Sequence, residues 1–163
     1  MHAIFSFPNP VNEKAARVVA AVVLLTALVI LATGAYWLLI PLVYGFWARV
    51  LTGPTLSPLG WLAQSVVAPA LGSKQPVAGP PKRFAQGMGA VMSTAALAFA
   101  LLVGDHALAD GPLIVLALAA GLESIFAFCL GCKVFGLLIR AGFVPEAVCA
   151  ECTDIRARLS AAG

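Results

Sequence analysis

Long stretches of apolar residues with few charges inside them constrain this chain more than any other feature. Apolar residues make up 61% of the 163 positions, charged residues make up only 10%, and the mean hydropathy is +0.99. Soluble domains typically have about 45–50% apolar and about 25% charged residues. The chain is therefore expected to be an integral membrane protein, with room for about four spanning helices of roughly 20 residues each.

The apolar stretches predict an all-α fold, a four-span transmembrane helix bundle that forms a single membrane domain over residues 1–163. The expected spans cover approximately residues 14–33, 36–51, 84–103 and 112–140, and a cytoplasmic tail is expected over 141–163. In the long loop before the third span, Ser57-Pro58 is a helix-start signature followed by a short apolar segment. We expect a short interfacial helix there, in the cytoplasmic loop.

The positions of the lysines and arginines predict one orientation in the membrane. Cytoplasmic connections of membrane proteins are enriched in Lys and Arg. All ten basic residues lie near the start of the first span, from the end of the second span to the start of the third, or near and after the end of the fourth span. The connection between the first two spans and the connection between the last two contain none. We therefore expect a multi-pass protein with both termini in the cytoplasm. This asymmetry and contact with anionic lipid headgroups explain the net charge of +3 without nucleic acid as a partner.

The four cysteines form two Cys-x-x-Cys pairs. Cys129 and Cys132 fall inside the fourth apolar stretch, and Cys149 and Cys152 follow in the tail. In a continuous helix the sulfurs of Cys129 and Cys132 could meet, because residues three apart share one face. The expected cytoplasmic side is a reducing compartment, which argues against a stable structural disulfide.

The reactivity of the first pair depends on its surroundings. Burial in an apolar helix disfavours a thiolate, whereas the cationic Lys133 next to Cys132 favours it. A pair in the middle of a helix also lacks the helix N-terminus that activates thiols, unless Gly131 lets the backbone open. A reactive pair therefore needs a break in the fourth span.

Three interpretations of the cysteines stay open. In the first, Cys129, Cys132 and Lys133 form a catalytic site for thiol redox or sulfur relay, and Cys149 and Cys152 relay from the tail. In the second, the four cysteines bind a metal, and zinc is expected because the spacing fits four-cysteine zinc sites. In the third, the cysteines only pack as small apolar side chains.

Glu123 is the only acidic residue expected within a span. A carboxylate in a membrane is costly, so it marks a functional site by default. The alternative is a protonated side chain that is hydrogen-bonded to Ser93 or Thr94 on the third span.

Four sequence elements resemble a known family when they are taken in order along the chain. They are Pro10-Val11-Asn12-Glu13, Ser57-Pro58-Leu59-Gly60, Pro81-Lys82-Arg83-Phe84-Ala85-Gln86 and Phe128-Cys129-Leu130-Gly131-Cys132. From about Asn9 to Arg140 the chain resembles a family of small bacterial membrane proteins called domain of unknown function 4395. The resemblance implies a four-helix protein of the bacterial inner (plasma) membrane. Some members are encoded near thioredoxin-like proteins and sulfurtransferases, which implies a cytoplasmic thiol partner for Cys129 and Cys132.

These observations favour a membrane thiol protein that exchanges electrons or sulfane sulfur with a cytoplasmic thioredoxin-like or sulfurtransferase partner, with no cofactor required. Enzymatic activity is left open, with thiol–disulfide exchange or sulfur relay as the candidates. The alternative is a non-catalytic accessory subunit of a larger membrane complex, whose cysteines hold a structural zinc ion or only pack. A transporter is not expected, because the four spans show no repeat or substrate path.

Overall fold

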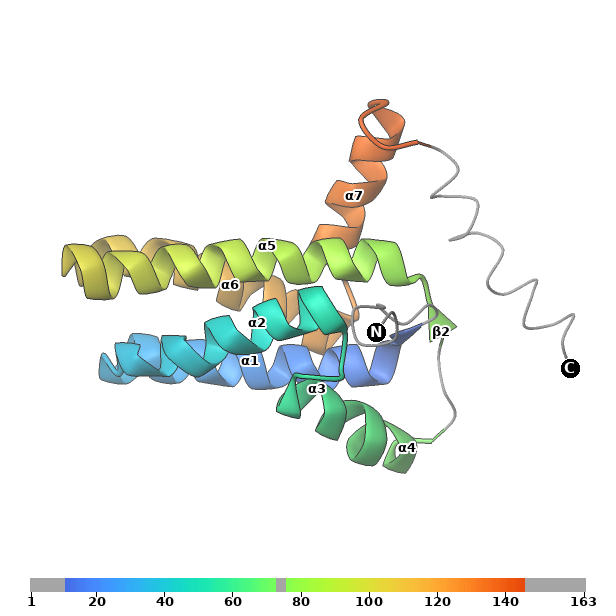
Figure 1. The fold of residues 1–163 in the computed structure, drawn as a ribbon, viewed down its shortest axis with the longest axis horizontal. Coiled ribbons are helices and arrows are strands. Elements are labelled where there is room, and N and C mark those ends of the chain that lie inside the picture. The colour runs from blue at the N-terminus through green and yellow to red at the C-terminus, as the bar shows by residue number, and fades with distance from the viewer. Residues whose placement is uncertain (1–10, 73–75, 146–163) are drawn as a thin grey trace, which may run out of the picture.

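The computed structural model describes residues 11–72 and 76–145 of the chain. This part is mostly helical, and its long helical segments run side by side along the longest axis of the molecule (Figure 1). The segments are α1 (Glu13–Thr33), η1 (Tyr36–Leu38) continued by α2 (Leu39–Thr52), α5 (Gly79–Ala98) continued by η3 (Phe99–Val103), and α6 (His106–Phe126).

The first helix begins and ends as its sequence predicts. The side chain of Asn12 accepts a hydrogen bond from the backbone N–H of Lys14 at 3.1 Å, which caps the N-terminus of α1. At the other end Gly34 adopts a left-handed φ of 70°, and its N–H donates to the carbonyl of Ile30 at 2.8 Å. The chain then turns back into η1 and α2.

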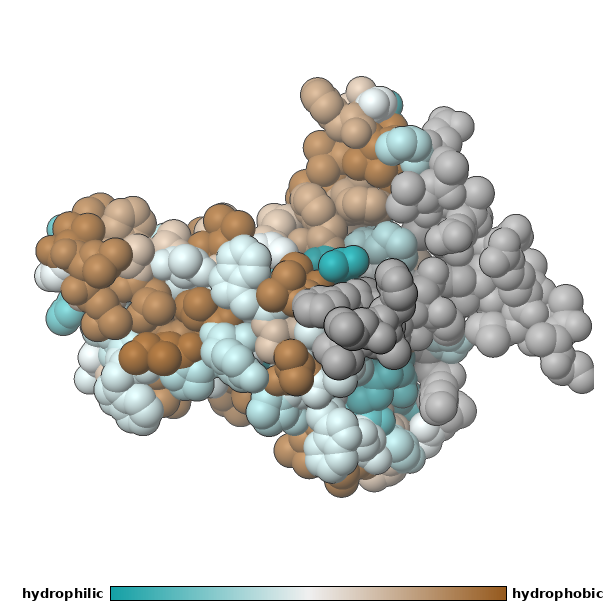
Figure 2. Space-filling view, viewed as in Figure 1, coloured by the Kyte–Doolittle hydropathy of each residue, from teal (hydrophilic) through white to brown (hydrophobic). Residues whose placement is uncertain are grey.

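Three helices are long and apolar enough to cross a membrane, namely Glu13–Thr33, Gly79–Val103 and His106–Phe126. The segment Tyr36–Thr52 is apolar but shorter. Hydrophobic residues gather at the end of the bundle where α5 continues into η3, and over α7 (Leu130–Arg140) (Figure 2). These features are consistent with the predicted membrane protein, and a span over Tyr36–Thr52 stays a prediction.

The loop between α2 and α5 contains the helix that its start signature predicts. The Oγ of Ser57 accepts a hydrogen bond from the N–H of Gly60 at 3.2 Å and caps this helix. The helix then runs as α3 (Pro58–Leu62), the π-helical turn η2 (Ala63–Val67) and α4 (Ala68–Ala70), and it packs on α1. Its location in the membrane interface stays a prediction.

A two-stranded pairing joins the starts of two helices. The strand β1 (Val11–Asn12) precedes α1, and β2 (Pro76–Val77) precedes α5. The two strands are antiparallel, with Val11 opposite Val77. The N-termini of α1 and α5 therefore lie at the same end of the bundle (Figure 1).

The fourth apolar stretch is not one helix, so the prediction of a continuous span over residues 112–140 is wrong. Asp105 starts α6 before Pro112, because its side chain accepts a hydrogen bond from the N–H of Leu108 at 3.1 Å. The helix ends at Phe126, and after a three-residue break α7 points away from the bundle at a steep angle (Figure 1). Hydrophobicity alone could not reveal this break, because the residues on both sides of it are apolar.

Candidate functional site

The break places the first cysteine pair at the start of a helix. Cys129 is the N-cap of α7, and its Sγ accepts a hydrogen bond from the backbone N–H of Cys132 at 3.3 Å. The two residues form a disulfide, with their Cα atoms 5.2 Å apart. The sulfurs therefore meet as the spacing predicts, but the expected mid-helix position is wrong. A helix N-terminus stabilises negative charge, which is the feature that favours a thiolate in Cys-x-x-Cys pairs.

Arg17 of α1 holds the end of α6. Its guanidinium Nε and Nη2 donate hydrogen bonds to the carbonyl of Ser124 at 3.2 and 3.1 Å, and Nη2 also donates to the carbonyl of Ile125 at 3.3 Å. The last carbonyls of a helix have no partner within the helix. Arg17 supplies that partner in the turn just before the break, so α1 helps to fix where α7 begins.

A close contact between two small residues seats α7 on α5. A Cβ atom added to Gly131 would lie 2.5 Å from the Cβ of Ala85 and 2.6 Å from its Cα. The rings of Phe84 and Phe135 extend the contact, with their centroids 5.5 Å apart. Only glycine fits at position 131, so this residue allows close packing instead of opening the helix as the sequence suggested.

The two cysteines differ in their access to solvent. Cys129 is only 8% exposed, whereas Cys132 has intermediate burial. Cys132 is therefore the more exposed residue of the pair.

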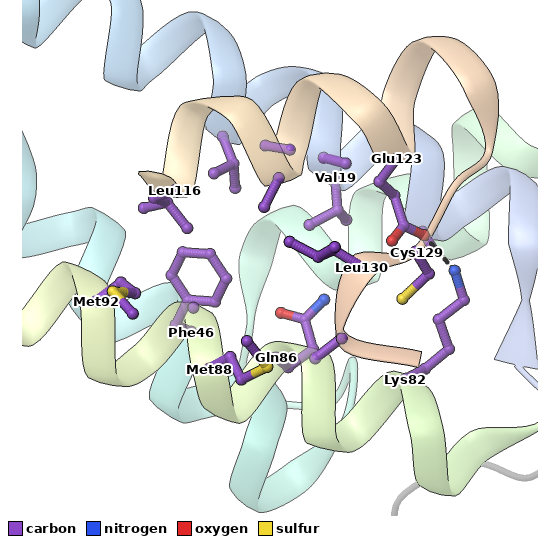
Figure 3. Close-up of a pocket in the computed structure, with 18 of the residues that line it drawn as sticks. Val19, Phe46, Lys82, Gln86, Met88, Met92, Leu116, Glu123, Cys129 and Leu130 are labelled. Atoms are coloured by element: carbon purple, nitrogen blue, oxygen red, sulfur yellow. Dashed lines mark hydrogen bonds and ion pairs between the residues drawn. The ribbon is translucent and has the colours of Figure 1, made fainter. Parts of the chain in front are cut away.

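An ion pair lies beside the buried cysteine. The ammonium of Lys82 on α5 contacts the carboxylate of Glu123 on α6, and their side chains are only 9% and 14% exposed (Figure 3). The expected partners of Glu123 are occupied elsewhere: Ser93 donates to the carbonyl of Ala90, and Thr94 accepts from the indole N–H of Trp47 at 3.1 Å. Glu123 therefore does bond to the expected third span, but through Lys82 instead of Ser93 or Thr94.

A cavity of about 100 Å³ lies between α1, α2, α5 and α6, and we call it the inner cavity. The sulfur of Cys129 and the pair formed by Lys82 and Glu123 lie at one end of it (Figure 3). The other end is apolar and includes Phe46 and Leu116. The site thus combines a disulfide, a buried ion pair and an apolar chamber.

The family model for domain of unknown function 4395 (DUF4395) matches residues 11–140. The chain belongs to the DUF4395 family. No curated protein and no solved structure matches it. The match confirms the resemblance stated above, and it covers the helices of the bundle, the break and α7.

Three predicted site residues of this DUF4395 protein remain. Lys133 lies on the surface of α7, and Cys149 and Cys152 lie outside the described residues. Lys133 is exposed, and its ammonium lies 5.6 Å from the centre of the Phe128 ring. Its effect on the thiolate stays a prediction. Cys149 and Cys152 lie outside the described residues, so the tail relay and the four-cysteine metal site are untested predictions. Within residues 11–72 and 76–145, no group of three or more His, Cys, Asp or Glu side chains could hold a metal ion.

Sequence reasoning missed two residues that build the site in this DUF4395 protein. Arg17 counts in the sequence only among the basic residues that predict orientation, and Lys82 counts there and in one of the family elements, although each bonds to α6 near the break. A signal for Lys82 was present, because it lies at the start of the third apolar stretch and Glu123 lies towards the end of the next. Antiparallel neighbours bring such positions to the same level.

Proposed function

We propose that this DUF4395 protein is a membrane thiol protein whose Cys129 and Cys132 exchange electrons or sulfane sulfur with a cytoplasmic thioredoxin-like or sulfurtransferase partner. The observation that carries the proposal is the position of the pair at the N-terminus of α7, where Cys129 is the N-cap. This geometry supplies the thiolate stabilisation that a pair in mid-helix would lack.

The distribution of charge supports a cytoplasmic location for the pair, in a four-span protein of the bacterial inner membrane with both termini inside. The described basic residues lie at the end of the bundle from which α7 projects (Figure 1). They are Lys14, Arg17, Arg49, Lys82, Arg83, Lys133 and Arg140. Because Lys and Arg are retained on the cytoplasmic side, a cytoplasmic partner would approach this end. There α7 and the segment from α3 to α4 would lie in the membrane interface.

Because Cys132 is more exposed than Cys129, we expect a dithiol partner to react at Cys132. A partner thiolate attacks the Sγ of Cys132, the bond between Cys132 and Cys129 breaks, and Cys129 leaves as a thiolate at the N-terminus of α7. A second partner thiol then attacks the mixed disulfide and releases Cys132. Two electrons and two protons pass from the partner to the pair, and the partner becomes a disulfide.

Sulfane sulfur would enter through the same residue. In the reduced protein the thiolate of Cys132 attacks the outer sulfur of a partner persulfide, and the partner's own thiolate leaves. Cys132 then carries the persulfide. Both reactions require an accessible Cys132 and do not require an accessible Cys129.

Trapping of a mixed disulfide tests the proposal. Both variants are made in full-length protein in which Cys149 and Cys152 are also replaced by serine. The Cys129→Ser variant then keeps only the accessible Cys132 and lacks an internal thiol that would release the partner, so we expect it to form a stable adduct. The defined test partner is a purified thioredoxin whose resolving cysteine is replaced by serine and whose remaining cysteine is activated as a disulfide with thionitrobenzoate. The thiolate of Cys132 displaces thionitrobenzoate, and the adduct is read by non-reducing electrophoresis and mass spectrometry. Cys132→Ser in the same background is the matched control, because its one remaining thiol, that of Cys129, is buried. Absence of an adduct with Cys129→Ser, or an equal yield from both variants, would contradict the proposal.

Metal analysis separates this function from the structural zinc alternative. The reduced full-length protein is purified without chelator, and its zinc content and reactive thiols are measured before and after chelation. A thiol-exchange protein should contain well below one equivalent of zinc, and its thiol titration should not change on chelation. One equivalent of zinc that protects all four thiols would support the accessory role instead.

A further inference from the structure

The buried cysteine faces the interior of the bundle. Cys129 lines the inner cavity, and its sulfur lies at the end where Lys82 and Glu123 form their ion pair (Figure 3). The cavity is partly open to the surface of the bundle. A molecule inside it would therefore contact the sulfur that a cytoplasmic protein reaches least.

The polar groups of the inner cavity are concentrated near this sulfur. Gln86 lines the cavity together with Lys82, and its Oε1 accepts a hydrogen bond from Nε of Arg49 at 2.9 Å. The amide N–H groups of Gln86 remain available as donors. A carbonyl oxygen on a ligand would thus find the ammonium of Lys82 near Cys129, and the amide of Gln86 further into the cavity (Figure 3).

The rest of the inner cavity suits an uncharged, apolar ligand. Its walls include the side chains of Val23, Phe46, Met92 and Leu116, together with several alanines. Lys82 is already paired with Glu123, so the site offers no uncompensated charge from this pair to a charged ligand. The helices that form the cavity include the three that are apolar enough to cross a membrane. A lipid-soluble ligand therefore suits this part of the bundle.

We propose that the inner cavity binds the ring of a lipid-soluble quinone against Cys129, with the apolar chain of the quinone extending out through the open side of the cavity, and that this quinone oxidises the reduced cysteine pair. A quinone fits because it combines carbonyl acceptors with an apolar body, and because it takes up the two electrons that a dithiol releases. The inference rests on the proposed function, and it adds the acceptor to which electrons from the cytoplasmic partner pass.

The oxidation balances without any other reactant. The thiolate of Cys129 adds to a ring carbon of the quinone, forming a carbon–sulfur bond and placing an electron pair on a carbonyl oxygen. The thiolate of Cys132 then attacks the Sγ of Cys129, the disulfide forms, and the carbon–sulfur bond breaks with its electron pair on the ring. The two protons of the original thiols go to the two oxygens, so one dithiol and one quinone give one disulfide and one quinol.

A cavity-filling variant separates quinone oxidation from thiol exchange. Ala120→Leu adds three carbons to a buried residue of the cavity wall, and Ala107→Leu makes the same change at an exposed position of the same helix. Each full-length protein is reduced with a phosphine, freed of reductant and mixed with a short-chain quinone such as decylubiquinone. Quinol formation is followed by absorbance, disulfide formation by mass spectrometry, and exchange of the disulfide with dithiothreitol is measured in parallel.

We expect one quinol per disulfide in the wild type and in Ala107→Leu. In Ala120→Leu the rate of quinol formation should fall at least about tenfold, since a displaced quinone ring loses alignment with the sulfur of Cys129. The rate of disulfide exchange with dithiothreitol should be unchanged. Wild-type protein that exchanges with dithiothreitol but forms no quinol would overturn the quinone inference and leave the proposed function standing. Protein that makes quinol but forms no adduct with thioredoxin would instead overturn the proposed partner. An equal quinol rate in Ala120→Leu and Ala107→Leu would also overturn the assignment to this cavity.

A photoreactive quinone provides a second measurement that does not depend on the redox state of the cysteines. Labelling of the oxidised wild-type protein should map to peptides containing Met88 or Met92 and should be competed by decylubiquinone. It should be lost in Ala120→Leu. Labelling confined to the lipid-facing side of the helices would overturn the inference even if Ala120→Leu failed to fold.

Discussion

Gly131 of α7 packs directly against Ala85 of α5. A Cβ atom at position 131 would lie 2.5 Å from the Cβ of Ala85, which is closer than two carbon atoms can approach without one of them moving. The contact lies within the first turn of α7, next to both cysteines. The position of the disulfide relative to the bundle therefore depends on the absence of a side chain at residue 131.

The first prediction concerns this contact. Gly131→Ala should destabilise the protein by about 1–3 kcal/mol, because overpacking forces backbone shifts, and it should change the rate at which dithiothreitol reduces the disulfide. Thermal unfolding in detergent and reduction kinetics measure the two effects. Ala85→Gly in the Gly131→Ala background should recover only a small part of the loss, since it removes the Cβ of residue 85 but leaves its Cα 2.6 Å from the added atom.

Gly136 provides the matched control on the same helix. A Cβ added there would meet nothing within 4 Å, so Gly136→Ala should be neutral or should stabilise α7 by up to about 1 kcal/mol through helix propensity. Similar losses of stability in Gly131→Ala and Gly136→Ala would contradict the packing argument.

The second prediction concerns the backbone of the break. Ala127 adopts a left-handed φ of 54°, and it is the only described residue other than glycine with a positive φ. This conformation costs an L-residue roughly 1–2 kcal/mol, so Ala127→Gly should raise the free energy of unfolding by up to about 1 kcal/mol. Ala21→Gly in the interior of α1 should lower it by about 1 kcal/mol. Urea or thermal unfolding compares the two variants, and equal losses would show that residue 127 is not strained.

The third prediction concerns Arg17 as the cap of α6. Arg17→Gln should lower stability by about 1–3 kcal/mol, because the carbonyls of Ser124 and Ile125 lose a charged donor. Amide hydrogen exchange in the last turn of α6 should become faster. Arg140→Gln removes the same charge at an exposed position, and it should leave exchange in α6 unchanged. Unchanged exchange in both variants would count against a capping role.

The sequence predicts most of the bundle because its signals are local. Asn12 and Ser57 start helices by accepting hydrogen bonds from backbone groups a few residues away, and Gly34 ends a helix through its own backbone freedom. Such caps need no tertiary partner. The apolar stretches likewise reflect the preference of each helix for a membrane, whatever its neighbours are.

The break before the cysteines depends on contacts that are distant in the sequence. Ala127 has no intrinsic preference for a left-handed backbone, and its conformation is held where α1 supplies Arg17 and α5 accepts Gly131 against Ala85. An apolar stretch of sequence does not reveal such contacts. The sequence therefore predicts a continuous helix over residues 112–140. The cysteine pair was found from its spacing, but its position at a helix N-terminus could only come from the packing.

The fourth prediction concerns the buried pair of Lys82 and Glu123. Removing one partner leaves the other charge uncompensated in a poorly solvated site, so Lys82→Met or Glu123→Gln should each cost about 3–5 kcal/mol of stability. The double variant Lys82→Met with Glu123→Leu should recover most of this loss, since an apolar pair of similar volume needs no solvation. Thermal unfolding of the wild type and the three variants measures these losses.

The double variant separates a charged pair from simple packing. If it lost as much stability as the two single variants together, the loss would come from altered packing between α5 and α6, and the ion pair would not be what holds the polar end of the inner cavity.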